Sequence, residues 1–169
     1  MGIVLRRATE TDLDFLVELL TAEDVEPFLG ARSERGRDGL RAELERQDAE
    51  PDAFGRFVIE VDGEAAGICG FHRVNERNRI AHLEKFAVHS RFRGRGVGDE
   101  AARALQRHLL IDLGYHRLEL EIYGFNERAI AHAERSGYVR EGVRRQAYER
   151  HGEWQDGVLF GLVREDLDA

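Results

Sequence analysis

The chain has little cysteine, little proline and no long apolar run, and each shortage excludes a class of structure. Its 169 residues include one cysteine, Cys69, so no disulfide can form within the chain. No apolar run approaches the roughly 20 residues that a membrane-spanning helix needs. The N-terminus carries neither a secretory signal nor a myristoylation motif. We therefore expect a protein of the cytoplasm with no membrane partner.

Lysine is also scarce, and acidic residues outnumber basic ones. Of 25 basic residues, all but Lys85 are arginine. A biased genome composition explains this preference most simply, and selection for ion-pair networks is the alternative. The net charge of −8 argues against broad nucleic-acid binding, because a phosphate backbone attracts cationic surfaces. We expect no nucleic-acid partner.

Signatures of metal binding and of nucleophilic catalysis are missing. No two of the seven histidines have the spacing H-x-x-x-H, so we predict no metal site. The serine-nucleophile signature G-x-S-x-G does not occur. Cys69 lies in the apolar stretch 66–71, which favours a buried packing role over a reactive thiol.

Hydrophobic periodicity predicts a mixed α/β fold in one domain spanning residues 1–169, with the order β-α-α-β-β-β-α-β-α-β-β. Helical spacing of apolar residues predicts helices at 11–26, 33–48, 97–113 and 127–136. Alternating apolar residues predict strands at 3–8, 56–61, 65–74, 80–88, 117–123, 138–148 and 157–164. Turn residues join two pairs of these strands at Asp62-Gly63 and His151-Gly152.

The segment 86–98 has the pattern of a phosphate site: a strand ends, a short loop follows, and a helix begins on glycine. Free N–H groups at the start of a helix bind anions, and glycine lets a phosphate approach the backbone closely. Arg93 and Arg95 add positive charge in an otherwise acidic chain. These features predict a site for a phosphorylated ligand.

Three other interpretations of this segment exist: two are other kinds of nucleotide site, and the third assigns the loop no ligand. Gly96 to Ala101 formally fits the dinucleotide fingerprint G-x-G-x-x-A, but a charged loop separates these glycines from the preceding strand. A kinase-type P-loop would need a Gly-Lys-Ser/Thr sequence, which is missing. The third interpretation is a glycine loop that only turns the chain.

Three blocks in this order resemble the GNAT acetyltransferases, and the resemblance spans nearly the whole chain. Residues 93–98 resemble the family signature R/Q-x-x-G-x-G/A, with an apolar strand before it and a long helix after it. Residues 126–130 and 136–138 resemble its N-x-x-A-x…G-F block. Residues 142–156 resemble the C-terminal hairpin of the branch that includes ribosomal-protein N-terminal, amino-acid and polyamine acetyltransferases. The resemblance implies a GNAT fold with a mostly antiparallel sheet flanked by helices.

The resemblance also implies an N-acetyltransferase that moves an acetyl group directly from acetyl-CoA to a primary amine of a small molecule or to a protein N-terminus. A non-catalytic acyl-CoA-binding module is the alternative, and a homodimer is left open. Main-chain groups of three strand residues would pair with the pantetheine arm: Phe86, Ala87 and Val88. N–H groups of six loop residues would bind the pyrophosphate: Arg93, Gly94, Arg95, Gly96, Val97 and Gly98. Asn126 would contact the pantetheine near the acetyl group.

The acceptor amine must lose a proton before it attacks the thioester, so a base is useful. His82 and Glu84 match strand positions where family members place the base. At a period of two, we expect both to share a face with Phe86 and Val88. Glu84 is the favoured base and His82 the second candidate, and joint action of the two through a water molecule is the third possibility. Pairing with a surface arginine such as Arg79 is the non-catalytic interpretation.

One position departs from the family pattern. Many members carry a tyrosine seven residues after the asparagine, where it acts as general acid toward the leaving thiolate. Here that position is Ala133. The departure leaves the identity of the acid open, with Tyr123 and Tyr138 nearby in sequence. We still expect activity without a tyrosine at this position, because coenzyme A thiolate is a good leaving group that dipoles in the site can stabilise.

Overall fold

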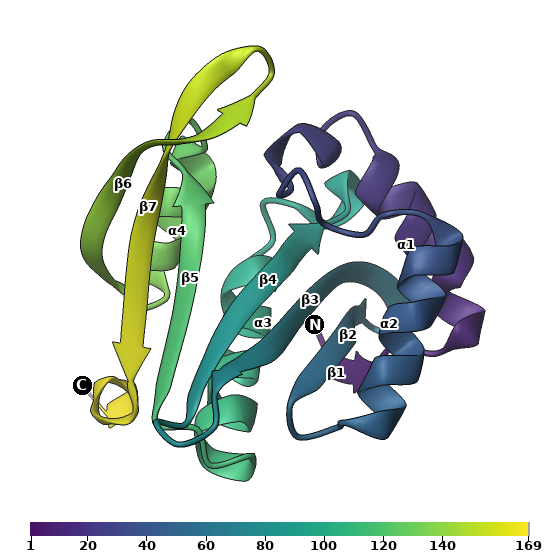
Figure 1. Cartoon of the computed structure of the whole chain (residues 1–169). Coiled ribbons are helices and arrows are strands. Elements are labelled where there is room, and N and C mark those ends of the chain that lie inside the picture. Colours follow the sequence, from purple (N-terminus) through teal and green to yellow (C-terminus); the bar gives the residue numbers. More distant parts are fainter. Residues whose placement is uncertain (169) are drawn as a thin grey trace.

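The computed structural model describes residues 1–168 and contains a seven-stranded sheet with helices on both faces (Figure 1). The strand order is β1-β2-β3-β4-β5-β7-β6. All neighbouring strands are antiparallel except β4 and β5, which are parallel. The strands are β1 (Ile3–Arg7), β2 (Phe54–Val61), β3 (Glu64–Asn75), β4 (Ile80–Val88), β5 (Arg117–Tyr123), β6 (Val139–Arg150) and β7 (Glu153–Val163). This order confirms the predicted fold class.

Two helices cover each face of the sheet (Figure 1). One face carries α1 (Leu13–Thr21) and α2 (Arg37–Ala49), and the other carries α3 (Val97–Arg107) and α4 (Glu127–Arg135). Short helical turns complete the chain: η1 (Glu10–Asp12), η2 (Glu26–Phe28), η3 (Ser90–Phe92), η4 (His108–Asp112) and η5 (Arg164–Asp168). Within residues 1–168, no helix combines the length and the apolar character that a membrane crossing requires.

Each face of the sheet has its own hydrophobic core. Leu13, Leu16 and Leu20 of α1 pack with Val58 and Ile68 on the first face. The core on the second face is larger. It buries the apolar stripe of α3 against the sheet and includes Cys69. Burial raises the pKa of the Cys69 thiol to about 12. Cys69 is therefore a packing residue and has no thiolate at neutral pH, as its apolar surroundings in the sequence indicated.

Several element boundaries differ from the predictions; the first helix, for example, ends at Thr21 rather than at residue 26. Two of the differences have local reasons. The predicted helix 97–113 changes its hydrogen-bonding pattern at His108, where α3 continues as the π-turn η4. The final strand begins at Glu153, four residues before the predicted 157. The two-residue turn at His151-Gly152 has positive φ at both positions, which lets β6 and β7 pair directly up to the turn.

The β4 strand contains a bulge. Ile68 of β3 pairs with Ala87, but Gly70 pairs with Glu84, so two residues of β4 lie opposite one residue of β3. Lys85 is one of these two residues and has a φ of +57°, a conformation that is uncommon for any residue except glycine. An inserted residue of this kind reverses the alternation of side chains along a strand.

The bulge shows that the predicted grouping of side chains on β4 is wrong. Phe86 and Val88 pack against the core on the α3/α4 face. Glu84 instead contacts Arg56 and His72 on the α1/α2 face, and His82 lies beside His72 there. His82 and Glu84 therefore lie on the opposite face from Phe86 and Val88, because a strict period of two fails across the bulge.

The close packing of β3 against the bulged strand predicts that Gly67 resists substitution. A Cβ atom at Gly67 would lie 2.4 Å from the Ala87 carbonyl oxygen, whereas one at Gly142 in β6 would meet nothing within 4 Å. We expect Gly67→Ala to lower the free energy of unfolding by about 1–3 kcal/mol. Gly142→Ala should change it by no more than about 0.5 kcal/mol. Urea denaturation measures both, and equal effects would contradict the packing described.

Candidate active site

The sheet splits between β4 and β5. Their ladder has only three pairs, and it ends where His82 pairs with Glu119. Beyond this point the two strands diverge toward their C-terminal ends (Figure 1). Residues 83–88 of β4 pair with β3 on one side and have no β5 partner on the other. Main-chain groups along this edge are available to an extended ligand that adds to the sheet like a strand.

The glycine loop lies between the end of β4 and the start of α3. Gly94 and Gly96 have φ values of +75° and +77°, which glycine adopts without steric strain. Gly96 is the N-cap of α3 and has no side chain, so the first turn of the helix has no side-chain cap. Its N–H groups and the helix dipole are therefore free to bind an anion.

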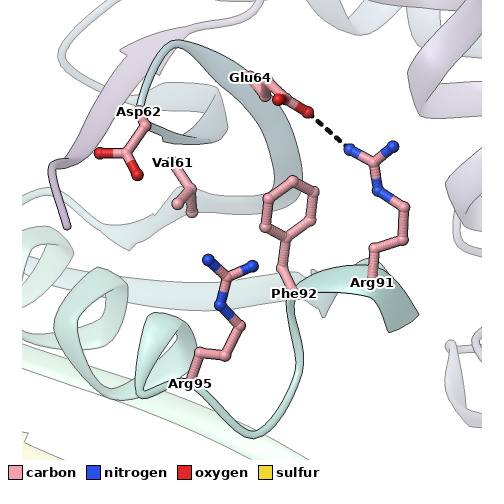
Figure 2. A pocket seen from close by; sticks show the side chains of 6 residues that line it. All are labelled: Val61, Asp62, Glu64, Arg91, Phe92 and Arg95. Atoms are coloured by element: carbon pink, nitrogen blue, oxygen red, sulfur yellow. Dashed lines mark hydrogen bonds and ion pairs between the residues drawn. The ribbon is translucent and has the colours of Figure 1, made fainter.

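The arginines of this loop have different partners. Arg93 donates through Nε to the Val88 carbonyl at 2.9 Å and pairs with Asp24 at 2.7 Å, so it ties the loop to β4 and to the segment after α1. Arg95 lies over the ring of Phe92 in a pocket of about 360 Å³ beside the β2–β3 turn (Figure 2). Within residues 1–168, no carboxylate pairs with Arg95. Its positive charge is therefore available beside the glycine loop.

Asn126 caps α4. Its Oδ1 accepts the N–H of Ala129 at 3.2 Å. The Nδ2 group of Asn126 donates no hydrogen bond to the part of the chain that the structure describes. One side chain can thus hold the helix and still present a donor to a ligand.

Position 133, where many family members have tyrosine, lies inside the protein. Ala133 is 3% exposed and belongs to the core of the α3/α4 face. Tyr138 is 6% exposed in the same core, and burial raises the pKa of its hydroxyl above the ordinary value. Tyr123 stacks on Phe125 at the end of β5, with ring centroids 5.2 Å apart. Tyr138 therefore does not replace a tyrosine at 133 as an accessible acid.

Glu84 is the centre of an ion-pair network on the α1/α2 face. Its Oε1 accepts from Arg56 at 2.8 Å and contacts Nδ1 of His72 at 3.0 Å. Burial acts to raise the pKa of Glu84, but the hydrogen bond from His72 and the charge of Arg56 lower it to about 2. The partner is a buried arginine rather than Arg79. A carboxylate with so low a pKa is a weak base.

His82 stands where the split between β4 and β5 begins. Its ring centroid is 5.2 Å from that of His72, and Glu119 lies across from it on β5. Burial and the neighbouring His72 lower the pKa of His82, while Glu84, Glu119 and Glu121 act in the opposite direction. A histidine with a lowered pKa is neutral at pH 7 and can accept a proton.

Two carboxylate oxygens near His82 have no partner within residues 1–168. Glu119 contacts Arg117 at 3.4 Å through Oε2, which leaves Oε1 free. Glu84 makes its contacts through Oε1, which leaves Oε2 free. Further along β5, Glu121 accepts from the hydroxyl of Tyr148. The start of the split therefore offers negative charge to a cationic group.

The segment after α1 and the β6–β7 hairpin meet beside the end of β5. Arg150 donates to the carbonyl and the side chain of Glu26, and His151 contacts the Pro27 carbonyl at 2.9 Å. Phe125 packs on Phe28 with a centroid distance of 5.9 Å. These contacts, between residues 97 to 124 positions apart in the sequence, place an aromatic wall of Phe28 and Phe125 beside the end of β5, where Phe125 also stacks on Tyr123.

Sequence reasoning missed two residues of this site. No pattern in the sequence distinguishes His72 from the other histidines of the chain, and none marks Arg56 as a functional residue. The signal that identifies them is the pairing register: His72 lies opposite His82, and Gly70 lies between Arg56 on β2 and Glu84 on β4. That register includes the bulge, so it could not be read from alternation within one strand.

The profile of the acetyltransferase (GNAT) domain family matches residues 3–139. The chain therefore belongs to the GNAT acetyltransferases, and it is an enzyme that transfers an acetyl group to an amine. The family resemblance seen in the loop 93–98 and in the block around Asn126 is thus confirmed.

Several known proteins are similar to this chain. A prophage-derived uncharacterized N-acetyltransferase of Bacillus subtilis is 27% identical over 134 residues, which cover 79% of this chain and 75% of the relative. The spermidine N(1)-acetyltransferase of Escherichia coli is 26% identical over 114 residues, covering 68% and 61%. The crystal structure of a Vibrio cholerae spermidine N-acetyltransferase with CoA and spermine has a TM-score of 0.86 at 19% identity, covering 99% and 98% of the chains. This structural similarity shows that the two chains share the same fold.

The network around Glu84 predicts a loss of stability in acid. The folded-state pKa of about 2 lies below the ordinary 4.5, so unfolding takes up a proton at low pH. The stabilisation is complete above about pH 5 and is lost as the pH falls toward 2. We expect Glu84→Gln to flatten the fall in unfolding free energy over this range, measured by urea denaturation at several pH values. The control Glu153→Gln, at an exposed position, should keep the wild-type slope.

Proposed function

We propose that this enzyme acetylates a primary amine of a small cationic molecule of the polyamine class, with acetyl-CoA as donor. The observation that carries this proposal is the pair of free carboxylate oxygens, on Glu84 and Glu119, on either side of His82. An ammonium group between them would be held by charge-assisted hydrogen bonds.

The cofactor would bind along the unpaired edge of β4 and at the glycine loop that follows it. The pyrophosphate would bind the N–H groups of residues 93–98, where the uncapped start of α3 favours an anion. Arg95 would add a charge contact. The pantetheine arm would pair with the free edge of Phe86, Ala87 and Val88, and Asn126 would donate its Nδ2–H to a pantetheine carbonyl. This arrangement points the thioester toward His82.

His82 replaces Glu84 as the favoured base in this proposal. The low pKa of Glu84 suits an anion that attracts the substrate, whereas the neutral imidazole of His82 suits proton transfer. Glu84 would bind the ammonium form of the acceptor, and His82 would take its proton as the nitrogen attacks the thioester. The coenzyme A thiolate would leave without a proton donor at position 133.

The relatives support the same acceptor class. Two proteins similar to this chain are named for acetylation of spermidine, and one was crystallised with spermine. Spermidine carries several ammonium groups on an alkyl chain. Such a chain suits the carboxylates of β5 and the aromatic wall of Phe28 and Phe125, because cations are attracted to aromatic faces.

A glycine substitution in the loop tests the cofactor site. Gly96 and Gly114 have nearly the same positive φ, and a Cβ at either would meet no atom within 4 Å. Alanine should therefore destabilise the fold by about 1 kcal/mol at both positions. Only Gly96→Ala should also weaken acetyl-CoA binding, by about tenfold or more, because its methyl group stands where phosphate approaches. Calorimetry with both variants decides, and equal acetyl-CoA affinities would contradict the assignment.

A turnover screen tests the acceptor. We expect acetyl-CoA consumption with spermidine and little with an uncharged amine analogue or with peptides that have a free N-terminus. Glu119→Gln should raise the KM for spermidine roughly tenfold, since about 1.4 kcal/mol of a charged contact is lost. Glu153→Gln is the control and should leave this KM unchanged. Faster turnover of peptides than of spermidine would overturn the acceptor class.

A further inference from the structure

His72 lies beside the proposed base and is partly exposed to solvent. Its Nδ1 contacts Oε1 of Glu84 at 3.0 Å, and its ring centroid is 5.2 Å from that of His82. The side chain of His72 is 30% exposed. A base in a substrate-filled site must return its proton to water before the next turnover. His72 offers a route for this proton from His82 to solvent.

We propose that His72 relays the acceptor's proton from His82 to solvent, with its ring held in place by Glu84. This inference rests on the proposed function, because His82 is the group that first takes the proton. His72 acts through His82 and is a positioning and relay residue. In the same way, a carboxylate orients a histidine in many hydrolytic sites by fixing one ring nitrogen.

The network behind Glu84 explains why this carboxylate orients His72 without taking its proton. Arg56 donates to both Glu84 and Glu43, and its side chain is only 3% exposed. Lys85 pairs with Glu43 at 2.5 Å and is also buried. The buried Arg56 therefore stands behind Glu84 and, together with the hydrogen bond from His72, keeps it ionised with a low pKa.

The groups that face His72 come from two neighbouring strands. Glu84 and His82 lie on β4, and Arg56 lies on β2. Behind Arg56, Glu43 of α2 balances its charge. On the far side of His82, Glu119 of β5 favours the protonated form of that ring. A proton that moves from His82 to His72 thus moves toward the ionised Glu84 and toward solvent.

The proton balance of one turnover is complete with these groups. The amine nitrogen forms a bond to the acetyl carbon as the carbon–sulfur bond breaks, and coenzyme A leaves as the thiolate. The proton lost by the nitrogen passes to Nε2 or Nδ1 of His82, then to the free ring nitrogen of His72, and then to water. No oxidant or metal is required. The relay therefore restores neutral His82 before the next acceptor binds.

A buffer-rescue experiment on the 169-residue chain tests the relay. We expect His72→Gln to lower kcat about tenfold in a weak buffer and to leave the KM for acetyl-CoA unchanged. Added imidazole should restore much of the lost rate, because a small base can enter the space and carry the proton away. His116→Gln is the matched control: His116 is exposed beside the start of β5, and its loss should affect neither kcat nor the response to imidazole.

Three outcomes decide against the relay. Unchanged kcat in His72→Gln at every pH overturns it. A lower kcat that imidazole does not restore, together with a lower unfolding temperature, assigns His72 a structural role. NMR titration of the His82 ring supplies a test without turnover: His72→Gln should raise the pKa of His82, because the neighbouring His72 lowers it. An unchanged pKa of His82 in this variant overturns the relay, whereas wild-type inactivity with every amine contradicts only the proposed function.

Discussion

The bulge in β4 is the constraint on which the arrangement of the active site depends. Because Lys85 and Phe86 together face one residue of β3, the strand presents different faces before and after this point. His82 and Glu84 lie on the α1/α2 face, and Phe86 packs in the core of the opposite face. A regular strand would place all three side chains on one face, so the polar side chains of His82 and Glu84 would then share that face with the apolar ring of Phe86.

Buried ions hold the bulge in place. The ammonium of Lys85 contacts Glu43 at 2.5 Å and the Glu34 carbonyl at 2.6 Å, and the side chain is 2% exposed. A positive φ outside glycine is unfavourable by about 1–3 kcal/mol, so it persists only where the surroundings enforce it. Buried ion pairs add little net stability, but breaking one partner is strongly destabilising. The network therefore selects one geometry for the strand.

This role also accounts for the single lysine of the chain. Every other basic side chain is arginine, yet the position at the bulge carries a compact ammonium on a flexible stem. The same network continues through Glu43 and Arg56 to Glu84, so the backbone geometry of β4 and the ionisation of the site are linked. The proposed division of work, with Glu84 as an anion and His82 as a base, follows from that link.

The sequence by itself determined the features that depend on neighbouring residues. Periodicity within each segment determined the order of strands and helices. The glycine loop at residues 94 and 96 and the helix cap at Asn126 depend on local φ angles and local hydrogen bonds. Only the tertiary structure decided the bulge, the pairing of Glu84 with Arg56, and the position of His72. These depend on the register between strands and on burial beneath α2. Register and burial are set by contacts between distant residues, which alternation within one strand does not reveal.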